Sequence, residues 1–95
     1  MIQVKDFATI ISSEEKGLQI FNAINSQLLE NEEQVVVDMS GVVSMATFCS
    51  KQIFGKLYKE MGSEKFYSRV SISNASEDIK TSIRLGIISE MNDRK

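Results

Sequence analysis

The chain has 95 residues, of which 42% are hydrophobic and 25% are charged, and its formal net charge is -2. These values are typical of one globular domain spanning residues 1–95, and the slight acidic excess argues against a nucleic-acid-binding surface. Histidine is absent and Cys49 is the single cysteine, which excludes histidine-dependent nucleophiles, histidine-ligated metals and an internal disulfide. We therefore expect a domain that is not an enzyme and that needs neither a metal nor a cofactor.

The sequence also predicts where the protein resides. Charged residues follow the first few positions before any apolar run forms, so no signal peptide is expected at the start. The longest apolar runs are a few residues long, whereas a membrane span needs ~20. We expect a cytoplasmic protein without a membrane segment.

The first third of the chain predicts one or two strands followed by a helix. Residues 2–5 alternate apolar and polar side chains, which predicts a strand. Residues 7–11 either extend this strand or form a second one. This N-terminal strand or hairpin could lie antiparallel at one edge of the sheet. Ser12 and Glu15 have the spacing of a helix-capping box. The helix that follows carries an apolar stripe and should end at the polar residues 31–33; the stripe comprises Gly17, Phe21, Ile24 and Leu28.

The middle of the chain predicts a central strand, a turn and a second helix. Residues 35–37 are all valine, which is typical of a strand covered on both faces at the centre of a sheet. Asp38 and Gly41 are expected to stabilise the turn after it. A helix beginning at Thr47 should end at Gly62, because Gly62 follows apolar residues at helical spacing.

The last third predicts a strand over residues 70–73 and a helix capped by Asn74 or Ser76. Gly86 is expected to close that helix, with residues 87–88 forming a short final element. Strands that alternate with helices indicate parallel pairing. The expected fold is therefore an α/β domain, with a small mixed but mostly parallel sheet of about four strands and three helices.

Several residues near the second helix admit two interpretations. Thr47 is either the N-cap of that helix or a modified hydroxyl, and the two roles are compatible. Phe48 is either a core anchor or an exposed contact for a partner. Cys49 is better explained as a small buried side chain than as a reactive thiol. Asp38 is better explained by the turn than as a carboxylate in a site.

The stretch Val-Val-Val-Asp-Met-Ser-Gly-Val at residues 35–42 resembles the central strand and turn of STAS domains, the family named for sulfate transporters and anti-sigma-factor antagonists. The similarity continues through Phe-Gly-Lys-Leu-Tyr at residues 54–58 and Asn-Ala-Ser-Glu at residues 74–77. It covers about residues 34–89. The resemblance implies a STAS-like fold whose role is protein binding.

In anti-sigma-factor antagonists, a serine at the start of this helix is phosphorylated by a partner kinase, and the unphosphorylated form binds that partner. The Asp-Ser-Ser-Gly stretch of the family falls here on Ala46, Thr47, Phe48 and Cys49. The resemblance thus implies Thr47 as the phosphoacceptor, and an anti-sigma factor or a histidine-kinase-type ATPase of a bacterial signalling system as the partner. The expected contact residues are Ser44, Phe48, Ser50 and Lys51.

Two questions stay open at the level of sequence. Because Ala46 stands where the family has aspartate, a constitutive binding or scaffold module without phosphorylation is the alternative function. The oligomeric state is also open, and a weak homodimer is compatible with the sequence.

Overall fold

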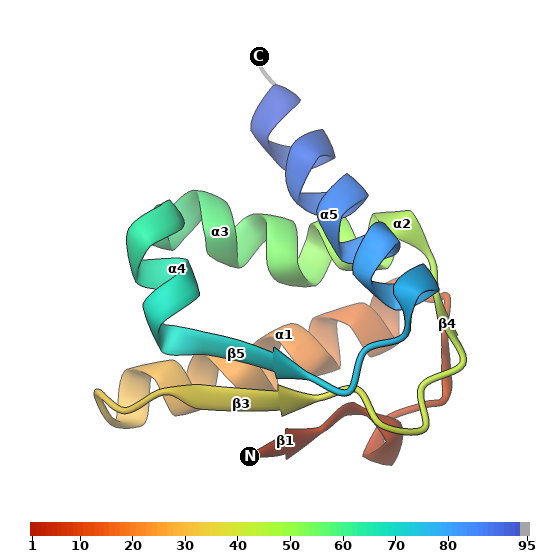
Figure 1. The fold of residues 1–95 in the computed structure, drawn as a ribbon, viewed down its shortest axis with the longest axis horizontal. Helices are drawn as coiled ribbons and strands as arrows, with labels where there is room; N and C mark the ends of the chain where they lie inside the picture. Colours follow the sequence, from red (N-terminus) through yellow and green to blue (C-terminus); the bar gives the residue numbers. More distant parts are fainter. Residues whose placement is uncertain (94–95) are drawn as a thin grey trace.

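The computed structural model describes residues 1–93, which form two small parallel sheets and four helices (Figure 1). One of the four helices carries two labels, α2 and α3, because a π-helical segment joins them. The strands are β1 Ile2–Gln3, β2 Ile10–Ile11, β3 Val35–Asp38, β4 Ser44–Met45 and β5 Val70–Ser73. The helices are α1 Glu14–Glu30, α2 Thr47–Ser50, α3 Lys56–Met61, α4 Ser63–Arg69 and α5 Glu77–Asn92. A π-helical segment, Lys51–Gly55, joins α2 and α3 into one continuous helix. The expected α/β class is confirmed.

The main sheet has the strand order β1-β3-β5, and a separate two-stranded sheet pairs β2 with β4. Both pairings within the main sheet and the β2–β4 pairing are parallel, so an antiparallel edge strand at the N-terminus is not observed. The reason lies in a 3-10 turn, Val4–Asp6, that interrupts the chain after β1. This turn ends the first strand early and lets residues 10–11 leave the main sheet to pair with β4.

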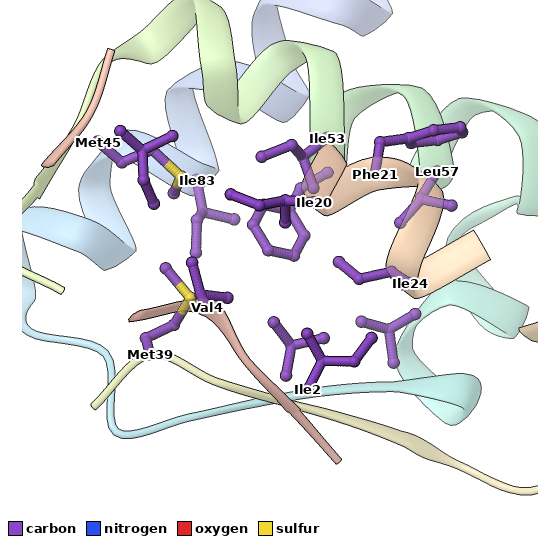
Figure 2. Close-up of a cluster of buried hydrophobic side chains, with 14 of the residues drawn as sticks. Ile2, Val4, Ile20, Phe21, Ile24, Met39, Met45, Ile53, Leu57 and Ile83 are labelled. Carbon is purple, nitrogen blue, oxygen red and sulfur yellow. The ribbon is translucent and has the colours of Figure 1, made fainter. Parts of the chain in front are cut away.

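The central strand β3 is covered more fully on one face than on the other. Val35 and Val37 are buried and belong to the hydrophobic core. Figure 2 shows part of this core, between the sheet and the helices. Val36 points to the opposite face because side chains alternate along a strand, and it is only half-buried. The expected central position of this strand is confirmed by the order β1-β3-β5, whereas the expected cover on both faces is only partial at Val36.

Helix α1 begins and packs largely as its pattern predicts. Its N-cap is Ser13, whose Oγ accepts the Lys16 N–H at 3.2 Å, so the N-cap lies one residue after the expected Ser12 and the expected capping box with Glu15 is wrong. Gly17 and Phe21 face the core, as the apolar stripe indicates. The helix ends before Asn31, at the polar break.

The helix that begins at Thr47 runs to Met61 and stops at Gly62, as expected. Gly62 has a φ of 85°, a conformation that glycine adopts without strain. The short helix α4 that follows was not expected. It buries only Phe66, so its seven residues carry almost no helical pattern of apolar side chains.

Helix α5 starts at Ser76, whose Oγ accepts the Ile79 N–H at 3.2 Å. It continues through Gly86 to Asn92, so the expectation that Gly86 closes the helix is wrong. A Cβ at Gly86 would lie 2.6 Å from the Lys51 backbone nitrogen, and one at Gly55 would lie 2.8 Å from the Gly86 carbonyl oxygen. Both glycines therefore allow α5 to pack directly on the backbone of the Thr47–Met61 helix.

Candidate functional site

The start of α2 presents Thr47 to solvent. Thr47 is exposed, and the N-cap of the helix is Ala46, whose carbonyl accepts the Cys49 N–H at 2.9 Å and the Ser50 N–H at 3.1 Å. The interpretation of Thr47 as the N-cap is therefore wrong. Ala46 still belongs to the extended chain, since its N–H donates to the Ile11 carbonyl at 2.8 Å, and the helix turns immediately after it. The Thr47 hydroxyl forms no hydrogen bond with any residue among 1–93 and is free to react or bind.

Exposed apolar side chains occur next to Thr47 in the sequence, and on β2, the strand that pairs with β4. Phe48 is 50% exposed, Val43 is 67% exposed and Ile10 is 59% exposed. The β2–β4 pairing sets Ile10 beside Ser44, and the Val43 N–H donates to the Thr9 carbonyl at 2.7 Å. We call the group Ile10, Val43, Ser44, Thr47 and Phe48 the α2-start surface. Exposed apolar side chains on neighbouring segments of a small domain are typical of an interaction surface.

Ser50 does not belong to this surface, although the sequence placed it among the expected contact residues. It is fully buried, and its Oγ lies 2.7 Å from Ser82 Oγ. Because Ser82 Oγ donates its one proton to the Met45 carbonyl at 2.8 Å, Ser50 must donate to Ser82. Ser50 therefore fastens α2 to α5 and cannot reach a partner in this fold.

Lys51 is also directed toward α5. Its Nζ lies 3.3 Å from the Asp93 carboxylate, and the side chain is half-buried. Further along the same helix, Lys59 reaches Glu90 at 3.5 Å. These lysines thus contact the acidic side of α5. Of the four expected contact residues, Ser44 and Phe48 are the ones that the fold leaves exposed beside Thr47.

Cys49 lies in the first turn of the same helix but points into the core. It is fully buried, and its thiol donates to the Ser13 carbonyl at 3.4 Å. Burial raises the pKa of the Cys49 thiol, and the nearby Glu14 carboxylate raises it further. Because the thiolate is the nucleophilic form, this environment suits a packed side chain and disfavours a reactive one.

Asp38 ends the central strand and accepts hydrogen bonds from three segments. Its Oδ1 accepts from Asn74 Nδ2 at 2.9 Å and from the Ser40 N–H at 3.0 Å, and its Oδ2 accepts from Gln3 Nε2 at 3.4 Å. The hydrogen bond from Asn74 contributes most to lowering the pKa of the Asp38 carboxyl, followed by the one from the Ser40 amide. The carboxylate thus holds the turn that contains Gly41, at a φ of 82°, and ties β1 and the end of β5 to β3.

The pH dependence of stability should report this carboxylate. Because its folded pKa is lowered from the ordinary value of 3.8, Asp38 stabilises the fold above that value, and this contribution disappears as the pH falls through the folded pKa. We expect Asp38→Asn to lower the urea midpoint at pH 7, with a smaller difference from the wild type at pH 3. An equal difference at both pH values would contradict the role of the charge.

The sequence did not reveal that Asn74 and Gln3 bind Asp38, or that Ser82 holds α2. Aligning the strand ends would have indicated the first two, because Gln3 and Ser73 lie opposite Asp38 in the two ladders. Nothing in the local sequence indicates the role of Ser82, which is a single serine on the buried side of a helix. The function of Ser82 in fixing α2 depends on how α5 crosses that helix.

Residues 1–93 contain no cluster of three acidic or cysteine side chains that could hold a metal ion, nor a helix with the length and apolarity required to cross a bilayer.

Comparison with known proteins agrees with this architecture. The model of a family described as a STAS-like domain of unknown function (DUF4325) matches residues 16–80. This span runs from the first turn of α1 into the first turn of α5 and includes most of the α2-start surface. No curated protein and no solved structure matches the chain significantly. Because the match covers well over half of the sequence, the chain belongs to this family of STAS-like domains.

Proposed function

We propose that the protein is a regulatory protein-binding module, that it contacts its partner through the α2-start surface, and that phosphorylation of Thr47 switches this contact. The observation that supports the proposal most strongly is the free, exposed hydroxyl of Thr47 beside the exposed side chains of Phe48 and Val43. The resemblance to anti-sigma-factor antagonists suggests an anti-sigma factor or a histidine-kinase-type ATPase as the partner, in the cytoplasm of a bacterium.

A phosphate at Thr47 is compatible with the fold. Thr47 is the first residue of a helix that continues to Met61, and a helix N-terminus stabilises negative charge. The modification would add a charge of about -1.5 to -2 to the α2-start surface. A partner surface that accommodates Phe48 and a neutral hydroxyl would have to desolvate this charge. Phosphorylation should therefore weaken binding without unfolding the domain.

The alternative function is a constitutive binding or scaffold module that is never phosphorylated. Its support is the replacement of the family's Asp-Ser pair by Ala46 and Thr47, together with an aromatic side chain at Phe48. An exposed aromatic ring of this kind would strengthen a permanent contact. The two functions share one surface and differ only in whether the Thr47 hydroxyl accepts phosphate.

Thr47 variants test the proposal. The partner is copurified from host cells and titrated against Thr47→Glu, Thr47→Ala and the control Thr81→Glu, which adds the same charge at an exposed threonine on α5. We expect Thr47→Glu to weaken binding at least tenfold, ~1.4 kcal/mol, with Thr81→Glu close to the wild type. Thr47→Ala should bind normally and lose the phosphate detected by intact mass.

The outcomes separate the two functions. Normal binding by Thr47→Glu would contradict the α2-start surface as the contact. Weakened binding by Thr47→Glu, with no phosphate on the wild-type protein purified from its host, would favour the constitutive module. Phosphate that persists in Thr47→Ala would move the modification to another hydroxyl.

A further inference from the structure

The structure has a groove of about 410 Å³ that is lined by other residues than those of the α2-start surface. It lies between α3 and α4 on one side and α5 on the other, beside the end of β5. Its volume falls within the range of small-molecule sites, about 300–1,000 Å³. None of its lining residues belongs to the α2-start surface, so an inference about this groove is independent of the proposed function.

One wall of the groove is aromatic. Tyr58, Phe66 and Tyr67 form three edge-to-face pairs, with ring centroids 5.3–5.9 Å apart. Phe66 is buried and holds the cluster in place, whereas Tyr67 is 66% exposed. Ile72 and Ile83 add aliphatic surface from β5 and α5. A flat apolar ring could therefore pack against this wall and exclude water from it.

The opposite wall carries two cations one helical turn apart. Lys80 and Arg84 both line the groove from α5 and both are exposed. Lys80 lies 3.6 Å from Glu77, whose carboxylate is itself largely exposed. Arg84 forms no ion pair or hydrogen bond with any residue among 1–93. An unpaired guanidinium beside an apolar wall suits a carboxylate, which it can bind through two hydrogen bonds.

The ends of the groove favour a compact occupant over an extended peptide. The β5 strand is only four residues long, with α4 entering it directly at one end and a short turn leading into α5 at the other (Figure 1). A peptide strand added beside β5 could therefore pair over at most four residues. A single ring system with one acidic group needs no such pairing.

We propose that this groove binds a small anionic ligand with a planar aromatic ring, in which the ring packs on the tyrosine cluster and a carboxylate binds Arg84 and Lys80. The proposal rests on the aromatic wall and the unpaired cation facing the same cavity. It assigns the domain a ligand site in addition to its proposed protein contact.

Two probes with the same ring and opposite charge test the proposal. Indole-3-acetate and tryptamine are titrated separately into the ¹⁵N-labelled protein, and amide shifts are followed by NMR. We expect saturable shifts with indole-3-acetate, with a Kd of about 1 mM or tighter, at residues of β5, α4 and the first half of α5. Tryptamine should bind at least tenfold more weakly, because its ammonium group meets Lys80 and Arg84.

Matched variants identify the groups involved. Arg84→Gln should weaken indole-3-acetate about tenfold, since a hydrogen bond to a charged group is lost. Lys16→Gln removes the same charge from α1 and should leave binding unchanged. Equal binding of the two probes, normal binding by Arg84→Gln, or shifts located outside the groove would each overturn the proposal. The variant spectra show at the same time that the fold is retained.

Discussion

Replacing Val37 by aspartate should unfold the domain, whereas the same replacement at Val36 should leave it folded. Val37 is fully buried in the central strand and belongs to the hydrophobic core. A carboxylate there would have no partner, and burying an unpaired charge costs several kcal/mol against a total stability of about 5–15 kcal/mol. Val36 lies on the other face and keeps contact with solvent, so a charge there can remain hydrated.

Circular dichroism and thermal unfolding of the two variants provide the measurement. We expect Val37→Asp to lack a cooperative transition and Val36→Asp to retain one, at a lower Tm than the wild type. A cooperative transition near the wild-type Tm in Val37→Asp would show that the inward face of β3 is wrongly assigned. Loss of folding in both variants would mean that both faces of the strand are packed.

A second large effect is expected at Gly86, where α5 crosses the Thr47–Met61 helix. A Cβ at this position would approach the Lys51 nitrogen and the Ser50 carbonyl carbon at 2.6 Å, and both are backbone atoms that cannot move aside independently. Gly86→Val should therefore destabilise the domain by about 1–3 kcal/mol or more, as overpacking of a core does. The gain in helix propensity over glycine is only a few tenths of a kcal/mol.

The control for Gly86→Val is Ser89→Val, which introduces the same side chain at an exposed position of α5. Urea unfolding of both variants should show a large loss for Gly86→Val and a change of about 0.5 kcal/mol or less for Ser89→Val. Equal stabilities of the two variants would contradict the close packing of α5 on the helix that carries Thr47.

An element could be predicted where its sequence pattern is local, and could not where it depends on residues distant in the sequence. The strand at residues 35–38 and helix α1 were predictable because their apolar patterns are local and long enough to be distinctive. Strand β4 was not, since it exists only through its pairing with β2. Residues 10–11 do lie within the second strand expected at residues 7–11, but β2 pairs outside the main sheet. Gly86 was misassigned because glycine has the same local preferences whether it ends a helix or lets two helices approach.

The same limit applies to the candidate site. The sequence indicated the region between β4 and the second helix, and Thr47, Phe48 and Ser44 are exposed there. The sequence did not show that Ser50 is buried while these residues are exposed, because side chains within one helical turn point in different directions. The crossing of α5 decides which of them are covered. Ser50 lies beneath α5 against Ser82, whereas Thr47 lies outside that contact.

The central claim is that the α2-start surface is where the partner binds, and amide hydrogen exchange tests it most directly. Exchange is measured for the full-length protein alone and with the copurified partner at saturating concentration. We predict that the partner slows exchange at residues 43–48 and at Ile10, with little change along α4. Protection confined to α4 and α5, with unchanged exchange at residues 43–48, would contradict the account.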